Sequence, residues 1–205
     1  MSPRRPGLPP LDREALSDDP IEQFGEWFEL ARRDVPLAEA ISLATADADC
    51  NPNARMVLLK GFSREGFSFF TNYESAKGEE LTTNPRAALV VYWRELDRQV
   101  RVRGTVERLP GDESSAYFAT RPRDSQIAAA ASPQSWPIER KDLDDRYERL
   151  ARELGEGPVP RPDHWGGYLV RPDTIEFWQG RESRMHDRFR YTREGGRWRI
   201  ERLAP

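Results

Sequence analysis

Residues 178–191, "WQGRESRMHDRFRY", concentrate cationic and proton-carrying side chains near the C-terminal end of the sequence. In a β-strand, alternate side chains point to the same face. A strand is expected over residues 183–193, and one of its faces would carry Arg184, His186, Arg188 and Arg190. The opposite face would carry Met185, Phe189 and Tyr191, with Asp187 among them. A cationic row in a slightly acidic chain predicts either a solvated face or a face against which an anionic group lies.

Tyr117, Arg121 and Ser125 form a second candidate group, because they follow one another at spacings of four residues. On a helix, Tyr117 and Arg121 would meet on one face. Ser125 could curl back toward them after Pro122 ends that helix. A phenol, a guanidinium and a hydroxyl together suit a phosphate group. The alternative is an arginine that only binds the last carbonyl groups of its helix.

Two shorter stretches also place cations where an anion could bind. Ser75 and Lys77 stand where a short helix should begin, and helix N-termini attract anions through free N–H groups and the helix dipole. Arg55 and Lys60 stand at the two ends of an apolar run. The ordinary alternatives are capping of the helix by Ser75 and a buried strand with charged ends.

The composition limits the class of protein. With 205 residues the chain suits one domain, and its net charge of −3 argues against a general nucleic-acid binder. One cysteine excludes an intramolecular disulfide and favours a reducing compartment, while two histidines argue against a Cys/His zinc site. The first residues do not resemble a signal peptide, and no apolar run reaches the roughly 18 residues of a membrane span. We therefore expect a cytoplasmic protein with no metal site, no membrane span and no nucleic-acid partner.

Several common motifs are missing from the sequence. It contains no G-x-G-x-x-G, no Walker A, no G-x-S-x-G and no H-E-x-x-H pattern. Separate anion-suited positions in a chain rich in strand patterns favour a phosphorylated cofactor, a phosphorylated ligand, or both.

Hydrophobic periodicity places these positions on a mostly β scaffold. Residues 1–18, rich in Pro, Arg and Asp, predict a mobile arm before a single domain over 19–205. Asp19 and Pro20 predict a helix start, and from about residue 40 the period changes to two. Further helices are expected within 75–85, 112–132 and 139–157. The pattern predicts a mainly β fold with peripheral helices, built as a small barrel or closed sheet.

Seven stretches occur together in an order typical of one enzyme family. They are "RMVLLKGF", "TNYESAKGEEL", "NPRAAL", "RQVRVRGTVER", "YFATRPRDSQI", "PQSWPI" and "WGGYLVRPDTIEFWQGRESRMHDRFRY" with its continuation "WRIERLAP". Over roughly residues 19–205 the sequence closely resembles the pyridoxamine 5′-phosphate oxidases, flavin enzymes of vitamin B6 metabolism.

The resemblance implies an FMN-binding split β-barrel that forms a homodimer, with FMN at the dimer interface. It also implies the reaction, in which pyridoxamine or pyridoxine 5′-phosphate loses a hydride from C4′ to FMN and becomes pyridoxal 5′-phosphate. Dioxygen then takes up the electrons and yields hydrogen peroxide. The expected partners are thus a phosphorylated B6 vitamer, dioxygen and a second copy of the chain.

The resemblance assigns roles residue by residue. FMN-binding positions of the family fall on Arg55, Met56, Val57, Leu58, Leu59, Lys60, Phe70, Thr71, Lys77, Gln99, Gln134, Ser135, Trp178 and Arg188. Substrate-binding positions fall on Lys60, Tyr117, Arg121, Ser125, Arg184, Met185 and His186. Arg184 and His186 are expected to be catalytic, because they would face the pyridine ring and its departing hydrogens.

The sequence departs from the family pattern at several positions. Ala76 stands where a second basic residue usually precedes Lys77, and Phe70 stands where tyrosine is common. Without another cation, the missing charge would weaken FMN binding by about 1.5–3 kcal/mol. The family pattern has Gly, Gly and Trp at three further positions, where this sequence has Asp124, Ala128 and Ala130. Asp124 would add a carboxylate beside the expected substrate phosphate.

Two alternatives follow from these departures. A split-barrel oxidase of another flat aromatic, such as a reduced phenazine precursor, would keep the FMN contacts and change the substrate contacts. A non-catalytic protein that binds FMN or pyridoxal phosphate would not require Arg184, Met185 and His186. Because all the substrate-binding positions are retained, the B6 substrate is favoured.

Overall fold

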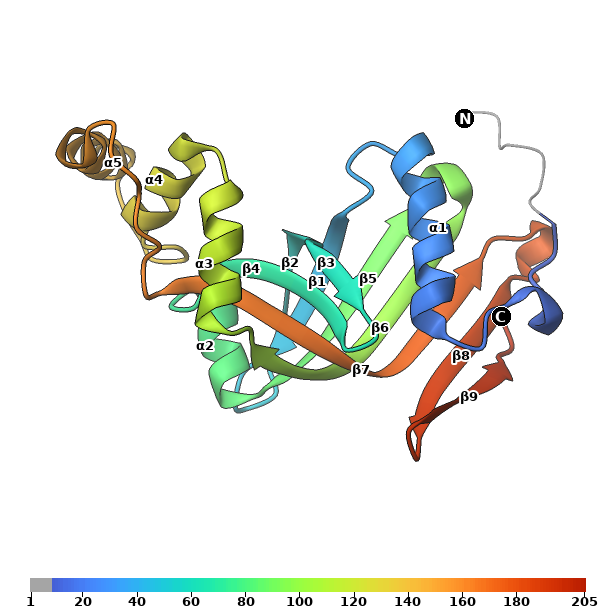
Figure 1. Cartoon of the computed structure of the whole chain (residues 1–205). Helices are drawn as coiled ribbons and strands as arrows, with labels where there is room; N and C mark the ends of the chain where they lie inside the picture. Colours follow the sequence, from blue (N-terminus) through green and yellow to red (C-terminus); the bar gives the residue numbers. More distant parts are fainter. Residues whose placement is uncertain (1–8) are drawn as a thin grey trace.

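A single antiparallel sheet forms the body of the protein. The structure, a computed structural model, describes residues 9–205. The sheet has nine strands in the order β2-β1-β5-β6-β7-β4-β3, while β8 pairs with β7 and β9 with β8 (Figure 1). The strands are β1 Ala40–Ala46, β2 Pro52–Leu58, β3 Gly61–Ser63, β4 Gly66–Asn72, β5 Arg86–Trp93, β6 Arg98–Arg108, β7 Trp165–Gln179, β8 Asp187–Glu194 and β9 Arg197–Arg202. The α-helices are α1 Pro20–Asp34, α2 Ala76–Thr83, α3 Gly111–Thr120, α4 Arg123–Ala131 and α5 Arg140–Leu154.

The long strand β7 joins two parts of the sheet. Its first residues pair with β4 and its last residues pair with β8, while β6 pairs along the other edge. The pairing of β6 with β7 shifts register between Arg103 and Gly104. A Cβ atom at Gly104 would lie 1.8 Å from the Arg171 carbonyl oxygen, so only glycine allows the strands to approach there. The curled sheet with helices at its margins confirms the predicted mainly β fold with peripheral helices.

Helix α1 closes the larger hydrophobic core against the sheet. The Asp19 carboxylate accepts a hydrogen bond from the Ile21 N–H and Pro20 occupies the first turn, as the sequence predicts. Phe24 packs edge-to-face on Phe67 at a centroid distance of 4.9 Å, and Trp27 packs likewise on Phe177 at 5.2 Å. Apolar side chains at helical spacing therefore bury one face of α1 on the sheet.

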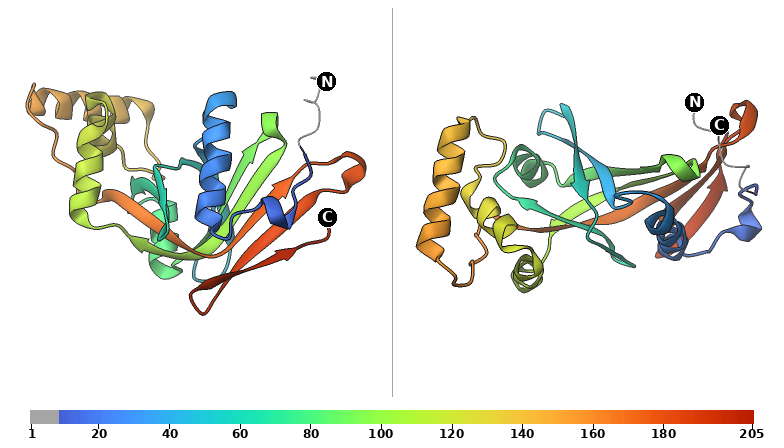
Figure 2. Two further views of the ribbon diagram at one scale, coloured as in Figure 1. Left: turned by 45° about the vertical axis from the view of Figure 1, so that its right-hand side comes forward. Right: turned by 90° about the horizontal axis from the view of Figure 1, so that it is seen from above.

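A smaller hydrophobic cluster holds α3, α4 and α5 at the end of the molecule away from α1 (Figure 2). Its buried members are Phe118, Ile127, Val159 and Trp165. Trp165 opens β7, so this cluster couples the helices to the sheet. Within residues 9–205, no helix is long and apolar enough to cross a membrane. The cytoplasmic location expected from the single cysteine stays a prediction.

The strand expected over residues 183–193 begins later, and the cationic face expected for Arg184, His186 and Arg188 together is wrong. Strand β7 ends at Gln179, a 3₁₀ turn spans Glu182–Arg184, and β8 begins at Asp187. Ser183 and Arg184 have positive φ angles of 55° and 61°, so the chain turns back and pairs β8 antiparallel with β7. Arg184 and His186 consequently lie in a loop and do not share a strand face with Arg188.

The N-terminal segment differs from the predicted mobile arm over the residues that the structure describes. Leu11 and Leu16 are buried against the core. The Leu11 N–H donates to Asp187, and the Tyr191 hydroxyl donates to the Ser17 carbonyl oxygen. Two leucines within a polar stretch are enough to dock residues 9–18, while residues 1–8 of the predicted arm lie outside the described residues.

Candidate active site

Lys77 is a buried cation at the start of α2. Lys77 is only 6% exposed, and its Nζ donates a hydrogen bond to the Ser75 hydroxyl at 3.0 Å. That hydroxyl in turn donates to the Asn72 carbonyl oxygen at 2.7 Å, so Ser75 does not cap the helix. Burial, followed by the charge of Arg55, lowers the pKa of Lys77 to about 8. Within residues 9–205 Lys77 forms no ion pair. An anion bound at the start of α2 could therefore pair with Lys77 without competing with a carboxylate of the protein.

Arg55 supplies the second cation near Lys77. It reaches inward from β2, where its Nη2 donates to Glu80 Oε2 at 2.9 Å, and it also donates to the Thr45 hydroxyl. Burial raises the pKa of the Glu80 carboxyl, but hydrogen bonds from Thr45, Asn53 and Arg55 hold it below its usual value. Lys77 and Arg55 carry two positive charges against the single negative charge of Glu80, so the cluster has a net positive charge. That charge partly offsets the basic residue that is missing at position 76.

The pKa of Lys77 predicts how FMN binding should depend on pH. In the FMN-free protein Lys77 loses its proton above about pH 8, whereas a bound phosphate would keep it charged. The FMN dissociation constant should therefore rise by up to about tenfold per pH unit above pH 8. Fluorescence titration of the apoprotein between pH 7 and pH 9.5 would measure this rise.

Lys77→Met provides the matched control for that titration. The variant should bind FMN more weakly at pH 7 and show a flatter dependence above pH 8. Its apoprotein should be no less stable at pH 7, because the folded state depresses the Lys77 pKa from 10.5 and so disfavours the charge. An unchanged pH slope in the variant would show that Lys77 is not the titrating group.

The loop that follows α4 folds against the end of β4. The Thr71 hydroxyl donates to Gln134 Oε1 at 3.2 Å, and the Trp136 indole N–H donates to the Glu74 carbonyl oxygen at 3.4 Å. Ser135 has a φ of 75°, which lets the loop turn at that residue. The fold thus brings Gln134 and Ser135 to the strand end that leads into α2.

Phe70, Tyr117 and Trp165 form an aromatic stack beside the predicted phosphate site. The Phe70 ring lies 4.0 Å from the Tyr117 ring and 5.6 Å from the Trp165 ring, with both pairs nearly parallel. The Phe70 side chain is therefore engaged with Tyr117, where the family pattern would add a hydroxyl. The stack fixes the phenol at the C-terminal half of α3.

Arg121 presents an unpaired donor next to this stack. Its guanidinium carbon lies 4.8 Å from the centre of the Trp165 ring, and its buried Nη1 has no hydrogen-bond partner among residues 9–205. Burial lowers the pKa of Arg121, although the nearby Tyr117 raises it. Buried donors are almost always paired, so an orphaned one marks a place for an anionic ligand.

Among residues 9–205, neither of the other two predicted phosphate ligands, Ser125 and Lys60, forms a hydrogen bond with Arg121. Ser125 is in the first turn of α4, half-buried, and Lys60 is exposed beyond the end of β2. Burial and then the charge of Asp124 raise the pKa of Tyr147, which places the Asp124 carboxylate against α5. The Asp124 carboxylate thus has a partner on α5, and its effect on the substrate phosphate stays a prediction.

Strand β2 exposes apolar side chains. Met56 is 62% exposed and Leu58 is also exposed, so the alternative of an ordinary buried strand with charged ends is wrong. Val57 and Leu59 point inward, as does Arg55. Exposed apolar patches of this kind mark interaction surfaces.

Gln99, Trp178 and Arg188 form a row across three neighbouring strands. Register pairs Gln99 with Trp178 and Trp178 with Arg188, so their side chains share one face. Arg188 is held by Glu176 Oε1 at 3.0 Å and by the Ala204 carbonyl oxygen at 2.9 Å. The fold thus brings together three residues to which the resemblance assigns FMN binding, and that role stays a prediction.

His186 lies against this row in a fixed orientation. Its ring centre is 4.7 Å from the Trp178 ring, and its Nδ1 accepts a hydrogen bond from the Arg181 N–H at 3.0 Å. Since a backbone N–H can only donate, Nδ1 carries no proton, and the neutral ring has its proton on Nε2. His186 therefore offers an N–H donor, while Met185 beside it is 69% exposed.

The predicted FMN residues form two groups at opposite ends of β7 (Figure 1). Thr71 pairs with Gly166 near the start of β7, whereas Trp178 lies twelve residues further along the strand. At about 3.3 Å per residue, the two groups are separated by about 40 Å of strand. One small ligand cannot touch both groups of the same chain.

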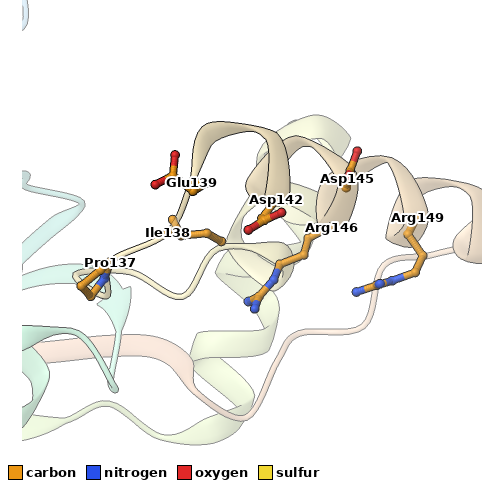
Figure 3. Close-up of a pocket in the computed structure, with 7 residues that line it drawn as sticks. All are labelled: Pro137, Ile138, Glu139, Asp142, Asp145, Arg146 and Arg149. Atoms are coloured by element: carbon orange, nitrogen blue, oxygen red, sulfur yellow. The ribbon is translucent and has the colours of Figure 1, made fainter.

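A broad surface pocket of about 850 Å³ lies elsewhere, between residues 137–139 and α5 (Figure 3). Charged side chains of α5 line it, including Asp142, Asp145, Arg146 and Arg149. It contains none of the predicted site residues. Its highly charged lining does not suit a flat aromatic ring.

Comparisons with known proteins decide the family. A sequence model described as pyridoxamine 5′-phosphate oxidase matches residues 28–151. The chain belongs to the pyridoxamine 5′-phosphate oxidase family. A second model, described as the pyridoxine 5′-phosphate oxidase C-terminal dimerisation region, matches residues 165–205 and supports a homodimer. The exposed face of β2 and the separated ligand groups agree with a site shared between two copies.

Several relatives in this family are similar over nearly the whole chain. The pyridoxine/pyridoxamine 5′-phosphate oxidase of Salinibacter ruber is 55% identical over 201 residues, covering 95% of this chain and 93% of that protein. The enzyme of the same name from Rubrobacter xylanophilus is 55% identical over 197 residues, covering 95% and 91%.

Solved structures share the fold. PhzG from Burkholderia lata, in complex with tetrahydrophenazine-1-carboxylic acid, superposes with a TM-score of 0.90 at 29% identity, covering 98% of this chain and all of that one. A pyridoxamine 5′-phosphate oxidase-related, FMN-binding protein from Nostoc punctiforme gives a TM-score of 0.74 at 17% identity, covering 88% and 96%. These neighbours support the split-barrel fold.

Three residues at the site were not predicted from the sequence. Glu80 could have been found, because it stands three positions after Lys77 on the same helix. Trp165 gave no local signal, because it contacts Arg121, which is distant in the sequence. Two of the three partners of Asp187, Leu11 and Arg202, are also distant in the sequence.

Proposed function

We propose that this protein is an FMN-dependent oxidase that converts pyridoxamine or pyridoxine 5′-phosphate to pyridoxal 5′-phosphate. The substrate loses a hydride and a proton, and dioxygen takes up two electrons and two protons to give hydrogen peroxide. With the amine substrate, water then hydrolyses the imine and ammonia leaves. The proposal rests above all on the buried, unpartnered Nη1 of Arg121, in a chain 55% identical to relatives named for this reaction.

The residues near α2 fit the phosphate of FMN. Lys77 is a buried cation without a carboxylate partner, and Arg55 adds a second positive charge. Thr71, Gln134 and Ser135 would supply polar contacts beside it. FMN, when bound, supplies a ring that accepts the hydride and returns the electrons to dioxygen.

Arg121 and Tyr117 would bind the phosphate of the substrate. The cation–π contact with Trp165 holds the guanidinium in place, so its free Nη1 is preorganised for an anionic oxygen. Lys60 and Ser125 would complete this phosphate site when the substrate enters. Anchoring the phosphate fixes the distance from C4′ to the reacting atoms, which lowers the entropic cost of reaction.

Arg184, Met185 and His186 would close over the pyridine ring from the partner subunit. His186 donates through Nε2 because the Arg181 N–H occupies Nδ1. It would therefore orient the oxygen or amine at C4′ by hydrogen bonding and would not act as an obligatory base. Arg184 would orient the ring and stabilise negative charge on it.

His186→Gln tests the donor role. Glutamine places an amide N–H near the position of Nε2, so kcat/KM should fall by less than about fivefold, whereas His186→Ala should lose about tenfold. Steady-state rates between pH 6 and pH 9 would compare the three proteins. A Gln variant as impaired as the Ala variant, with an altered pH profile, would show that His186 titrates during turnover.

The function itself is tested with the purified wild-type protein. Its absorbance spectrum reports bound flavin, and each B6 vitamer 5′-phosphate is then supplied in air. Equal amounts of peroxide and pyridoxal 5′-phosphate are expected. A colourless protein that does not take up FMN would contradict the proposal.

A second candidate substrate comes from the similarity to PhzG, whose structure holds tetrahydrophenazine-1-carboxylic acid. An oxidase of reduced tricyclic aromatics would share the fold and the FMN site. It would oxidise that compound with a higher kcat/KM than either B6 vitamer. Bound FMN without turnover of any of these substrates would instead indicate a carrier.

A further inference from the structure

Asp187 closes the loop that carries the proposed catalytic residues. It is the first residue of β8 and pairs with Gln179, the last residue of β7. Residues 180–186 therefore form the connection between the two strands, with Arg184 and His186 in its second half. Asp187 is only 8% exposed, although the proposed reaction gives it no role.

Three segments of the chain contact the Asp187 carboxylate. Its Oδ2 accepts the Leu11 N–H at 3.0 Å and forms an ion pair with Arg181 Nε at 3.3 Å. Its Oδ1 accepts from Arg202 Nη1 at 3.0 Å. One buried charge thus holds the N-terminal segment and β9 by charge-assisted hydrogen bonds, which are stronger than neutral ones, and the loop by an ion pair.

The loop depends on this anchorage because its own backbone is strained. Ser183 and Arg184 both adopt left-handed conformations, which persist in non-glycine residues only where surrounding contacts hold them. Within the loop, the Met185 N–H donates to the Glu182 carbonyl oxygen at 3.1 Å and the Arg181 N–H donates to His186 Nδ1 at 3.0 Å.

Arg181 links the carboxylate to the catalytic histidine. Its side chain pairs with Asp187 while its backbone N–H sets the protonation pattern of the His186 ring. Moving the Arg181 side chain would shift that N–H, and with it the direction in which His186 Nε2 points. The Gln179 amide adds to the base of the loop by donating to the Pro9 carbonyl oxygen at 2.8 Å.

We propose that Asp187 is a positioning residue, which acts through Arg181 to hold the 180–186 loop in the conformation that presents His186 and Arg184. This inference rests on the proposed function for its effect on turnover. Its effect on the loop is independent of that function. Leu11 and Arg202 are parts of the same support, so both ends of the described chain contribute to the site.

Asp187→Asn, studied as the FMN-loaded protein, tests the proposal with two measurements. Asparagine keeps the size and one acceptor oxygen but removes the charge. We expect kcat/KM to fall about 10- to 100-fold, with FMN retention changed less than about twofold. Hydrogen exchange of the loop amides, those of Arg181 and Met185, should accelerate at least about tenfold.

Asp173→Asn is the matched control. Asp173 also pairs with an arginine, Arg86, at 2.7 Å, but both side chains are largely exposed and lie on β7 and β5, away from the loop. This variant should retain wild-type turnover and loop exchange. Arg181→Gln should reproduce the effect of Asp187→Asn, and the double variant should be no worse than either single variant.

Two results would overturn the proposal. One is wild-type exchange of the loop amides in Asp187→Asn. The other is equal acceleration in the loop and in the amides of β5 and β6, which would make Asp187 merely a general stabiliser. A wild-type protein that takes up FMN but oxidises no B6 vitamer would contradict the proposed function alone, because the exchange measurement still decides whether Asp187 holds the loop.

Discussion

Replacing Arg121 by alanine should raise the KM for pyridoxamine 5′-phosphate by about 10- to 150-fold and leave FMN binding nearly unchanged. The range corresponds to about 1.5–3 kcal/mol, the usual contribution of a hydrogen bond to a charged group. The free Nη1 of Arg121 lies beside Tyr117 and Trp165, far along the chain from Lys77. Steady-state kinetics and FMN titration of the same preparation would measure both effects.

Arg123→Ala is the control for this prediction. Arg123 lies two residues away and donates to the carbonyl oxygens of Gly155 and Gly157, so it is committed to the protein backbone. Its removal should leave KM within about twofold of wild type. If Arg121→Ala lost FMN and substrate affinity equally, the two phosphate sites would have been assigned wrongly.

Two inactive variants should restore activity when their subunits are mixed. Lys77→Met damages the ligand group near α2, and Arg188→Gln damages the group at the far end of β7. If each site takes one group from each subunit, a mixed dimer contains one doubly damaged site and one intact site. Half of randomly assorted dimers are mixed, so co-refolding should recover about one quarter of wild-type activity.

A control mixture distinguishes recovery through a shared site from nonspecific recovery of activity. It combines two variants whose substitutions lie in the same group of ligand-binding residues. Lys77→Met and Arg55→Gln both damage the group near α2, so their mixed dimers contain a defect at every site and should stay inactive. Recovery of activity with this pair, or no recovery with Lys77→Met and Arg188→Gln, would contradict a site shared between subunits. Size-exclusion chromatography would verify that dimers form in each mixture.

Local rules predicted most of the elements. Asp19 and Pro20 start α1 because capping needs only adjacent residues, and alternation of Val100 and Val102 with exposed arginines identified β6. The same alternation was misleading over residues 183–186, which precede β8. Period-two patterning does not reveal a turn made by Ser183 and Arg184, because left-handed conformations in non-glycine residues are stabilised by distant contacts.

Some features of the candidate site could likewise be predicted from local spacing, and others could not. The spacing of Tyr117 and Arg121 was sufficient to predict their proximity, since one turn of helix brings them together. Trp165, which holds the Arg121 guanidinium, is distant in the sequence and gave no local signal. The docking of residues 9–18 was also missed, because composition reports polarity and not the fit of Leu11 and Leu16 to a core.

The sequence by itself determined the family, the mainly β scaffold and the chemical types of the ligand-binding side chains. These properties depend on residue identity and on spacings of a few positions, which persist in any extended or helical segment. Only the tertiary structure decided that Lys77 is buried and has no ion-pair partner within residues 9–205, that the Arg181 N–H orients His186, and that the two groups of predicted FMN residues lie about 40 Å apart along β7. Burial, backbone strain and separation arise from contacts between segments remote in sequence, so they exist only once the sheet has formed.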